Sequence, residues 1–320
     1  MPQWLFNRFH DEDSSLRPDF ALSGTVNWLK GLSLRVRETL ADESIDEFYR
    51  GVRRRTSNSS WENLVFENIL MALHNLSSLE SMNSLGDEYK YSCVRSAIVA
   101  WYYGVYGACK AMIAAQDGSN PEVHAKTAQL WGDLFSSTNL VPDPFNLYVP
   151  TLVKQEYEEV ISSMRDGNAY DLARMPTNNE EAFGAVLAYL NGTAKWYRER
   201  EEQKIKQSRE FKVLGVDNFR TNVARNLRDS KLRNRSVNFM HQAFRYRGKA
   251  NYRDSLYLSY GRDSSDIICG LISDLQNTLS WLLKISLKFS SRRIQESVWN
   301  QFEQDFAANS RICVSVTPSL

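Results

Sequence analysis

The residues best suited to chemistry lie in one stretch, residues 231–262, which reads KLRNRSVNFMHQAFRYRGKANYRDSLYLSYGR. His241 follows Arg235 in the segment RSVNFMH. A histidine of near-neutral pKa can move a proton, and an arginine can stabilise charge that develops on a phosphate. Cations interleaved with aromatic rings can hold a single strand of nucleic acid. The candidate nucleic-acid-binding residues are Arg245, Arg247, Lys249, Tyr252 and Arg253.

Together these side chains are sufficient for metal-independent cleavage of RNA, in which the 2′-hydroxyl attacks its own phosphate. Arg235 would stabilise the phosphate in the transition state, and His241 would act as general acid or base. The sequence contains none of the motifs GxxxxGK[ST], GxGxxG, HExxH or GxSxG. We therefore expect neither a cofactor nor a metal.

The spacing of Arg235, Ser236 and His241 resembles the Rx4-6H motif of the HEPN superfamily, small helical ribonucleases and toxins that assemble a composite site across a dimer. The segment RSAIVAWYYGVYGACKAMIAA, followed by PEVH ending at His124, is similar to the tyrosine-rich helix and downstream histidine of many small HEPN proteins. The resemblance covers less than half of the chain, residues 60–135 and 230–262.

The resemblance implies that Arg235 and His241 are catalytic and that the protein is a homodimeric endoribonuclease. It also implies a role as the toxic effector of a prokaryotic antiviral defence or toxin–antitoxin system. The interval between the tyrosine-rich segment and the motif is longer than in compact HEPN proteins, so an inserted helical subdomain is expected there.

Charge is distributed unevenly along the chain, although the total is close to neutral. Residues 1–194 contain 16 Lys and Arg against 25 Asp and Glu, whereas residues 195–262 contain 18 against 7. A segregated positive charge favours anionic partners such as nucleic acid, with RNA the favoured one. Alternatively, the two regions neutralise each other across an interface within the molecule.

Apolar residues recur at helical spacing almost throughout, and Gly and Pro number only 15 and 8. This pattern predicts an all-α multi-helix bundle, with a HEPN-like core on the resemblance above. Three regions are expected: an N-terminal helical region at 1–138, a helical insertion at 139–211 and a basic C-terminal helical region at 212–320. The predicted helices cover residues 23–40, 44–53, 61 onward with Ser60 as N-cap, 87–116, 122–135, 151–165, 179–211, 264–289 and 292–308.

The helix at residues 87–116 has small residues at steps of three and four, which let another helix approach closely. This stripe predicts a helix at the centre of the core or at a dimer interface. Its members are Ala97, Ala100, Gly104, Gly107, Ala108, Ala111 and Ala115.

Two segments have ambiguous secondary structure. The alternation in FRYR and SLYLSY, within residues 244–260, fits a β-hairpin, whereas Asn251 is a suitable cap for a short helix instead. The C-terminal sequence ICVSVTPSL fits an edge strand or a disordered end.

The sequence shows neither an export signal nor an uninterrupted membrane span, and its four cysteines form no CxxC pair. We therefore expect a cytoplasmic protein with no membrane contact. Besides the ribonuclease, two other functions fit: a non-catalytic helical protein that binds nucleic acid, and a scaffolding or regulatory subunit whose basic segment docks on an acidic protein.

Overall fold

The computed structural model describes residues 8, 18–165, 167, 171–251 and 265–314. This part of the chain is almost entirely helical, which confirms the all-α, multi-helix prediction. Its helices are α2 (Pro18–Thr39), α3 (Asp42–Phe48), α4 (Ser59–Asn83), α5 (Asp87–Asp117), α6 (His124–Trp131), α7 (Lys154–Ser163), α8 (Asn179–Gln207), α9 (Arg209–Val213), α10 (Asn222–Arg233), α11 (Phe239–Asn251), α12 (Ser265–Arg293) and α13 (Glu296–Asn309).

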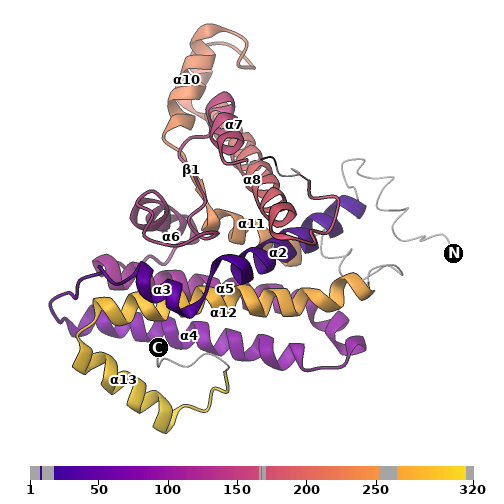
Figure 1. Ribbon diagram of the computed structural model, residues 1–320. Helices are drawn as coiled ribbons and strands as arrows, with labels where there is room; N and C mark the ends of the chain where they lie inside the picture. Colours follow the sequence, from indigo (N-terminus) through magenta and orange to yellow (C-terminus); the bar gives the residue numbers. More distant parts are fainter. Residues whose placement is uncertain (1–7, 9–17, 166, 168–170, 252–264, 315–320) are drawn as a thin grey trace.

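A layer of long helices forms the base of the molecule. In Figure 1, α4, α5 and α12 lie side by side along their lengths with α2 beside them, and α13 lies below the layer. Trp28 of α2 and Trp101 of α5 meet edge to face, with ring centroids 5.8 Å apart. Aromatic rings in this geometry stabilise each other beyond the area that they bury.

Small residues allow α5 to lie at the centre of this layer. A Cβ added at Gly107 would lie 2.9 Å from the carbonyl oxygen of Asn68 in α4, and one added at Gly104 would clash with Leu279 in α12. The close approach that the small-residue stripe predicts is therefore made within the molecule. It brings α4 and α12, which also pack on each other, close against α5.

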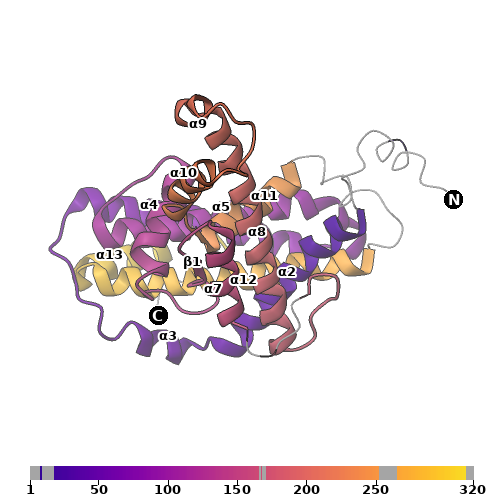
Figure 2. The same cartoon turned by 90° about the horizontal axis from the view of Figure 1, so that it is seen from above.

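A second group of elements lies on one side of the base layer. It consists of α6, α7, α8, α10, α11 and a short antiparallel pair, β1 (Tyr148–Val149) with β2 (Val237–Asn238). The first half of α8 packs on α2, and its second half extends away from the base with α9 and α10, as Figures 1 and 2 show.

The structure corrects several local predictions. Residues 244–251 continue α11 as a helix, so the FRYR segment is no strand, while residues 252–260 lie outside the described part of the chain. The N-cap of α4 is Asn58 rather than Ser60, because Asn58 Oδ1 accepts hydrogen bonds from the Ser60 and Trp61 amides. Residues 310–314 form neither helix nor strand, and the rest of the tail is not described.

One continuous buried cluster contains residues from all three predicted regions, such as Leu73, Leu187 and Leu282. The division at residues 138 and 211 stays a prediction. No helix within the described residues is long and apolar enough to cross a membrane.

We predict that Gly107→Ala lowers the free energy of unfolding by about 1–3 kcal/mol, because the new methyl group forces α4 and α5 apart. Gly270→Ala is the matched control, since a Cβ at this position of α12 meets nothing within 4 Å. Alanine in place of a helical glycine that has open space around it should raise the free energy of unfolding by roughly 0.5–1 kcal/mol. Urea unfolding measures both, and equal midpoints for the two variants would contradict the proposed constraint.

Candidate nucleic-acid interface

Asn238 fixes the start of α11 and ties it to α6. Its Nδ2 donates to the carbonyl oxygen of Ala128 at 2.7 Å, and its Oδ1 accepts from the backbone amide of His241 at 3.3 Å. The absence of a side chain at Gly132 makes room for this, since a Cβ there would lie 2.7 Å from Asn238 Nδ2. A capped helix whose first turn is bonded to α6 has a fixed rotation, so the direction of every α11 side chain is set.

His241 is held in the first turn of α11, against α8. Its Nδ1 lies 3.1 Å from Asn238 Oδ1, and its ring meets the Tyr197 ring edge to face at 5.0 Å. Because Asn238 Oδ1 only accepts, Nδ1 carries the proton and Nε2 has the free lone pair. Burial lowers the pKa of His241 to about 4, so the imidazole is neutral at pH 7.

Arg235 lies just before β2 and also faces α8. Its Nε is 3.4 Å from Glu201 Oε2, and its side chain is 61% exposed. Glu201 is one helical turn after Tyr197, so Arg235 and His241 border the same face of α8. The structure thus brings the two predicted catalytic residues near one helix, but each is bound to a different partner.

The predicted binding residues divide between two sides of α11. Arg245 faces α8, where Nη1 donates to Thr193 Oγ1 at 3.0 Å and the guanidinium lies over the ring of Tyr189. Arg247, two positions on, points away from α8 toward α5 and α6. The side chain of Lys249, and Tyr252 and Arg253 altogether, lie outside the described residues.

Arg247 belongs to a cluster that the sequence did not predict. Its guanidinium carbon lies 5.1 Å from the Tyr102 ring centroid, 5.2 Å from that of Phe244 and 5.8 Å from that of Tyr103. The Tyr102 hydroxyl lies 2.8 Å from Nδ1 of His124, at the start of α6. The His124 cluster comprises His124, Arg247, Tyr102, Tyr103, Tyr106 and Phe244, and it lies where α5, α6 and α11 meet.

Hydrogen bonding assigns the tautomer of His124. Burial raises the pKa of Tyr102 far above its ordinary value, so the phenol keeps its proton. Its hydroxyl has no other hydrogen-bond partner among the described residues, so it donates to Nδ1 and leaves the proton of the neutral imidazole on Nε2. Burial, then the charges of Arg247 and Lys110, lower the pKa of His124 and keep it neutral.

Arg247 has no counter-ion within the described part of the chain. No carboxylate of that part lies within ion-pair distance, and the Arg247 Nε is buried without a hydrogen-bond partner there. Nη1 is bonded to the Tyr103 hydroxyl at 3.2 Å. A half-buried guanidinium has lost part of its hydration, so it gains strongly from an anion that supplies acceptors.

The other groups around the cluster modify its charge. Lys110 lies over the Tyr106 ring at 5.5 Å, and burial lowers its pKa, whereas Glu122 and Glu67 act to raise it. These two acids offset Lys110 but form no ion pair with Arg247 among the described residues. Among the described residues, Arg247 is therefore the cation of this cluster that has no acid to pair with.

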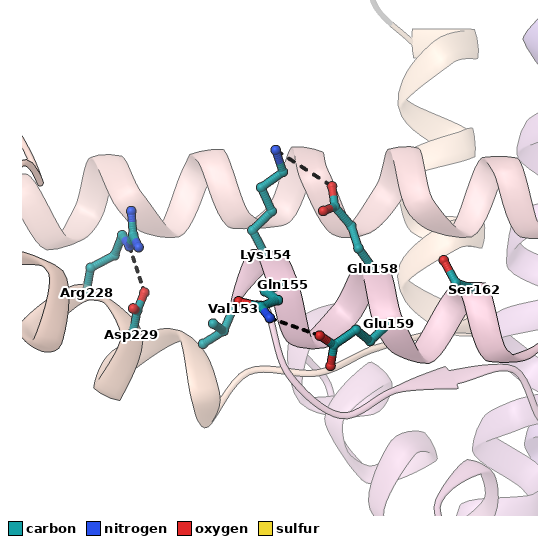
Figure 3. A pocket seen from close by; sticks show the side chains of 8 residues that line it. All are labelled: Val153, Lys154, Gln155, Glu158, Glu159, Ser162, Arg228 and Asp229. Atoms are coloured by element: carbon teal, nitrogen blue, oxygen red, sulfur yellow. Dashed lines mark hydrogen bonds and ion pairs between the residues drawn. The ribbon is translucent and has the colours of Figure 1, made fainter.

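A polar groove lies between α7 and α10 (Figure 3). Arg228 and Asp229 pair at 2.8 Å, and Gln155 donates to Glu159 at 3.0 Å. The charged lining comprises two cations and three acids, so the groove attracts an anion less than the His124 cluster does. Its lining residues are Val153, Lys154, Gln155, Glu158, Glu159, Ser162, Arg228 and Asp229.

The positive charge of residues 195–262 is not cancelled by the acidic N-terminal region over the part that is described. There, Arg233–Glu156, at 2.6 Å, is the one ion pair that joins the two. The remaining acids that pair with this segment, such as Glu201 and Glu210, belong to the segment itself. Its described cations therefore retain an excess of charge.

The sequence analysis named Arg247 as a candidate binding residue but did not connect it with His124. His124 and Arg247 are 123 positions apart, and no local pattern connects them. The available signal was the spacing of Tyr102 and Tyr106, which places two hydroxyls on one face of a helix. No three His, Cys, Asp or Glu side chains of the described residues gather as metal ligands.

No family model, no curated protein and no solved structure matches this chain. The HEPN resemblance consequently stays a prediction, as do the catalytic roles of Arg235 and His241.

We predict that the buried His241 makes the protein less stable in acid. Its pKa is about 4 when folded and about 6.5 when unfolded, so the unfolded chain takes up the extra proton between these values. The stability that the neutral His241 contributes to the free energy of unfolding is present above pH 6.5 and is lost as the pH falls toward 4. The free energy of unfolding therefore falls by about 2 kcal/mol between pH 7 and pH 5. Urea unfolding of the protein and of His241→Gln at both pH values isolates this contribution; identical pH dependence would contradict it.

Proposed function

We propose that this protein binds single-stranded nucleic acid, with RNA favoured, through the His124 cluster. The observation that carries the proposal is Arg247, a half-buried guanidinium among three aromatic rings with no acid to pair with in the described residues. A phosphate oxygen would supply the negative charge and the acceptor that the described residues do not provide. A guanidinium can bind a phosphate through two parallel hydrogen bonds.

The neighbouring groups suit a nucleotide better than a free anion. His124 presents a neutral Nε2–H, a second donor for a phosphate or for a base edge. The ring of Tyr103 is 36% exposed, whereas Tyr102 is fully buried, so Tyr103 is the ring on which a base can stack. Because stacking and phosphate contacts tolerate any base, we expect binding with weak sequence preference.

Ribonuclease activity is the second candidate, and the form of His241 favours it. The Nδ1–H bond to Asn238 leaves the Nε2 lone pair free, which is the form that a general base needs. Arg235 borders the same face of α8 and would stabilise the phosphate. In the His124 cluster the assigned tautomer places the proton on Nε2, so that cluster would bind the RNA rather than remove its proton. A toxin or defence role and a homodimer depend on the HEPN resemblance alone.

We predict that Arg247→Gln weakens binding of a fluorescein-labelled single-stranded RNA by about tenfold or more, because a hydrogen bond to a charged group contributes roughly 1.5–3 kcal/mol. Arg245→Gln is the matched control: it removes the same charge two positions away, on the side of α11 that faces α8. Fluorescence anisotropy at fixed salt measures both. Equal affinity losses in the two variants would show general charge attraction instead of recognition by the His124 cluster.

If the protein cleaves RNA, we predict that His241→Gln abolishes cleavage in EDTA and that Arg247→Gln raises KM while it leaves kcat unchanged. Glutamine keeps a donor for Asn238, so the variant should keep its circular dichroism and its thermal unfolding. The rate should stay constant from neutral pH to about pH 5 and fall as His241 becomes protonated near pH 4. Cleavage that persists in His241→Gln rules out the assigned base.

A further inference from the structure

A basic arm projects from the core beyond the candidate interface. It consists of residues 195–235, which are the second half of α8, α9, the connecting loop and α10 with the residues that follow it. Figure 2 shows α9 at the far end of this arm, and Figure 1 shows the arm on the side of the base layer that also carries α6 and α11. The arm has 13 Lys and Arg against 6 Asp and Glu.

Apolar residues that belong to the continuous buried cluster support the arm. The Phe211 and Phe219 rings meet at 5.0 Å, and the cations of Lys206 and Arg228 lie 5.6 and 5.5 Å from the Phe219 ring centroid. Ile205 and Ala224 are buried beside them. The arm therefore holds its outer side chains on an ordered scaffold.

Most acids of the arm form ion pairs, and among the described residues these pairs involve fewer than half of its cations. Glu202 pairs with Arg198 at 2.7 Å, and Glu210 pairs with Lys231 at 3.0 Å. Other cations have no ion pair with any described residue, and most of them are exposed. These unpaired cations are Lys195, Arg200, Lys206, Arg209, Lys212, Arg220 and Arg225.

The spacing of the unpaired cations suits a polyanion rather than a single small anion. Residues 195–207 rise by about 18 Å along α8, at about 1.5 Å per residue. That length spans more than one phosphate of a single strand, so one small anion could not contact the whole row. The unpaired cations are distributed over α8, α9, the connecting loop and α10. A distributed set of exposed cations attracts a phosphate backbone and reads no sequence.

We infer that the arm is a second nucleic-acid-binding surface, which holds the phosphate backbone of a strand whose other part lies in the His124 cluster. This inference rests on the proposed function and gives the arm a separate role. The His124 cluster recognises one nucleotide, and the arm adds affinity for longer strands. Two surfaces on one strand increase affinity because binding at the second becomes intramolecular.

The test uses Arg209→Gln/Lys212→Gln/Arg220→Gln, three exposed cations without ion pairs among the described residues. The matched control, Arg37→Gln/Arg50→Gln/Arg53→Gln, removes the same charge from exposed positions in α2 and in the segment that follows α3. Anisotropy is measured with single-stranded RNA of about 6 and about 30 nucleotides over a range of KCl concentrations. Circular dichroism and thermal unfolding confirm that all variants fold.

On the long strand, the arm variant should bind about tenfold more weakly, and the slope of log affinity against log salt should become less steep by about 2, or about 0.7 per lost phosphate contact. On the short strand it should bind like the unmodified protein. The control triple should match the unmodified protein on both strands.

Each remaining outcome has a definite meaning. Suppose that Arg247→Gln weakens binding to both strands while the arm variant binds RNA with the same affinity as the control triple. The inference about the arm is then overturned and the proposed function stands. If the arm variant alone is weakened, the arm binds nucleic acid and the role of the His124 cluster is wrong. If the arm variant keeps its RNA affinity but loses binding to poly-L-glutamate, the partner is an acidic polypeptide and the inference is overturned; an unmodified protein that binds no RNA overturns both proposals.

Discussion

Gly104 and Gly107 bring the α5 backbone against α12 and α4, and the other parts of the structure depend on this close packing. Glycine in a helix is less stable than alanine by about 1 kcal/mol, so the two positions are retained at the expense of local helix stability. The small face of α5 is covered by α4 and α12, which leaves its tyrosine-rich face for α6 and α11. The positions of Gly104 and Gly107 on α5 thus determine which face of the helix remains for the His124 cluster.

Much of the helical fold could be predicted because most helices are long and have regular apolar positions. The exceptions have physical reasons. In α11 the core residues Phe239, Ala243, Tyr246 and Ala250 have helical spacing, but FRYR places an arginine on each side of the buried tyrosine and imitates the alternation of a strand. In α10 only Ala224 and Leu232 are buried, so α10 gains its stability from packing on α8 and not from a continuous apolar stripe.

The candidate site was less predictable than the fold because burial and pairing decide what a charged residue can do. Arg245 and Arg247 look equivalent in the sequence, yet one is bonded to Thr193 inside the molecule and the other lacks a counter-ion among the described residues. Likewise, His124 and His241 are both neutral, but their hydrogen bonds place the proton on opposite ring nitrogens. Such differences arise from contacts that a single sequence does not display, several of them between residues more than 100 positions apart.

Because α8 continues without a break from the core into the arm, substitutions in its two halves are constrained differently. The first half of the helix carries Tyr189, which stacks on Trp28 in the core at 4.3 Å, whereas the outer face of the second half contacts solvent. Substitutions on that outer face alter charge with little effect on packing, since exposed positions contribute little to stability. The charge of the arm can therefore change while the core sequence stays constrained, so the arm is where relatives of this protein should differ most in charge.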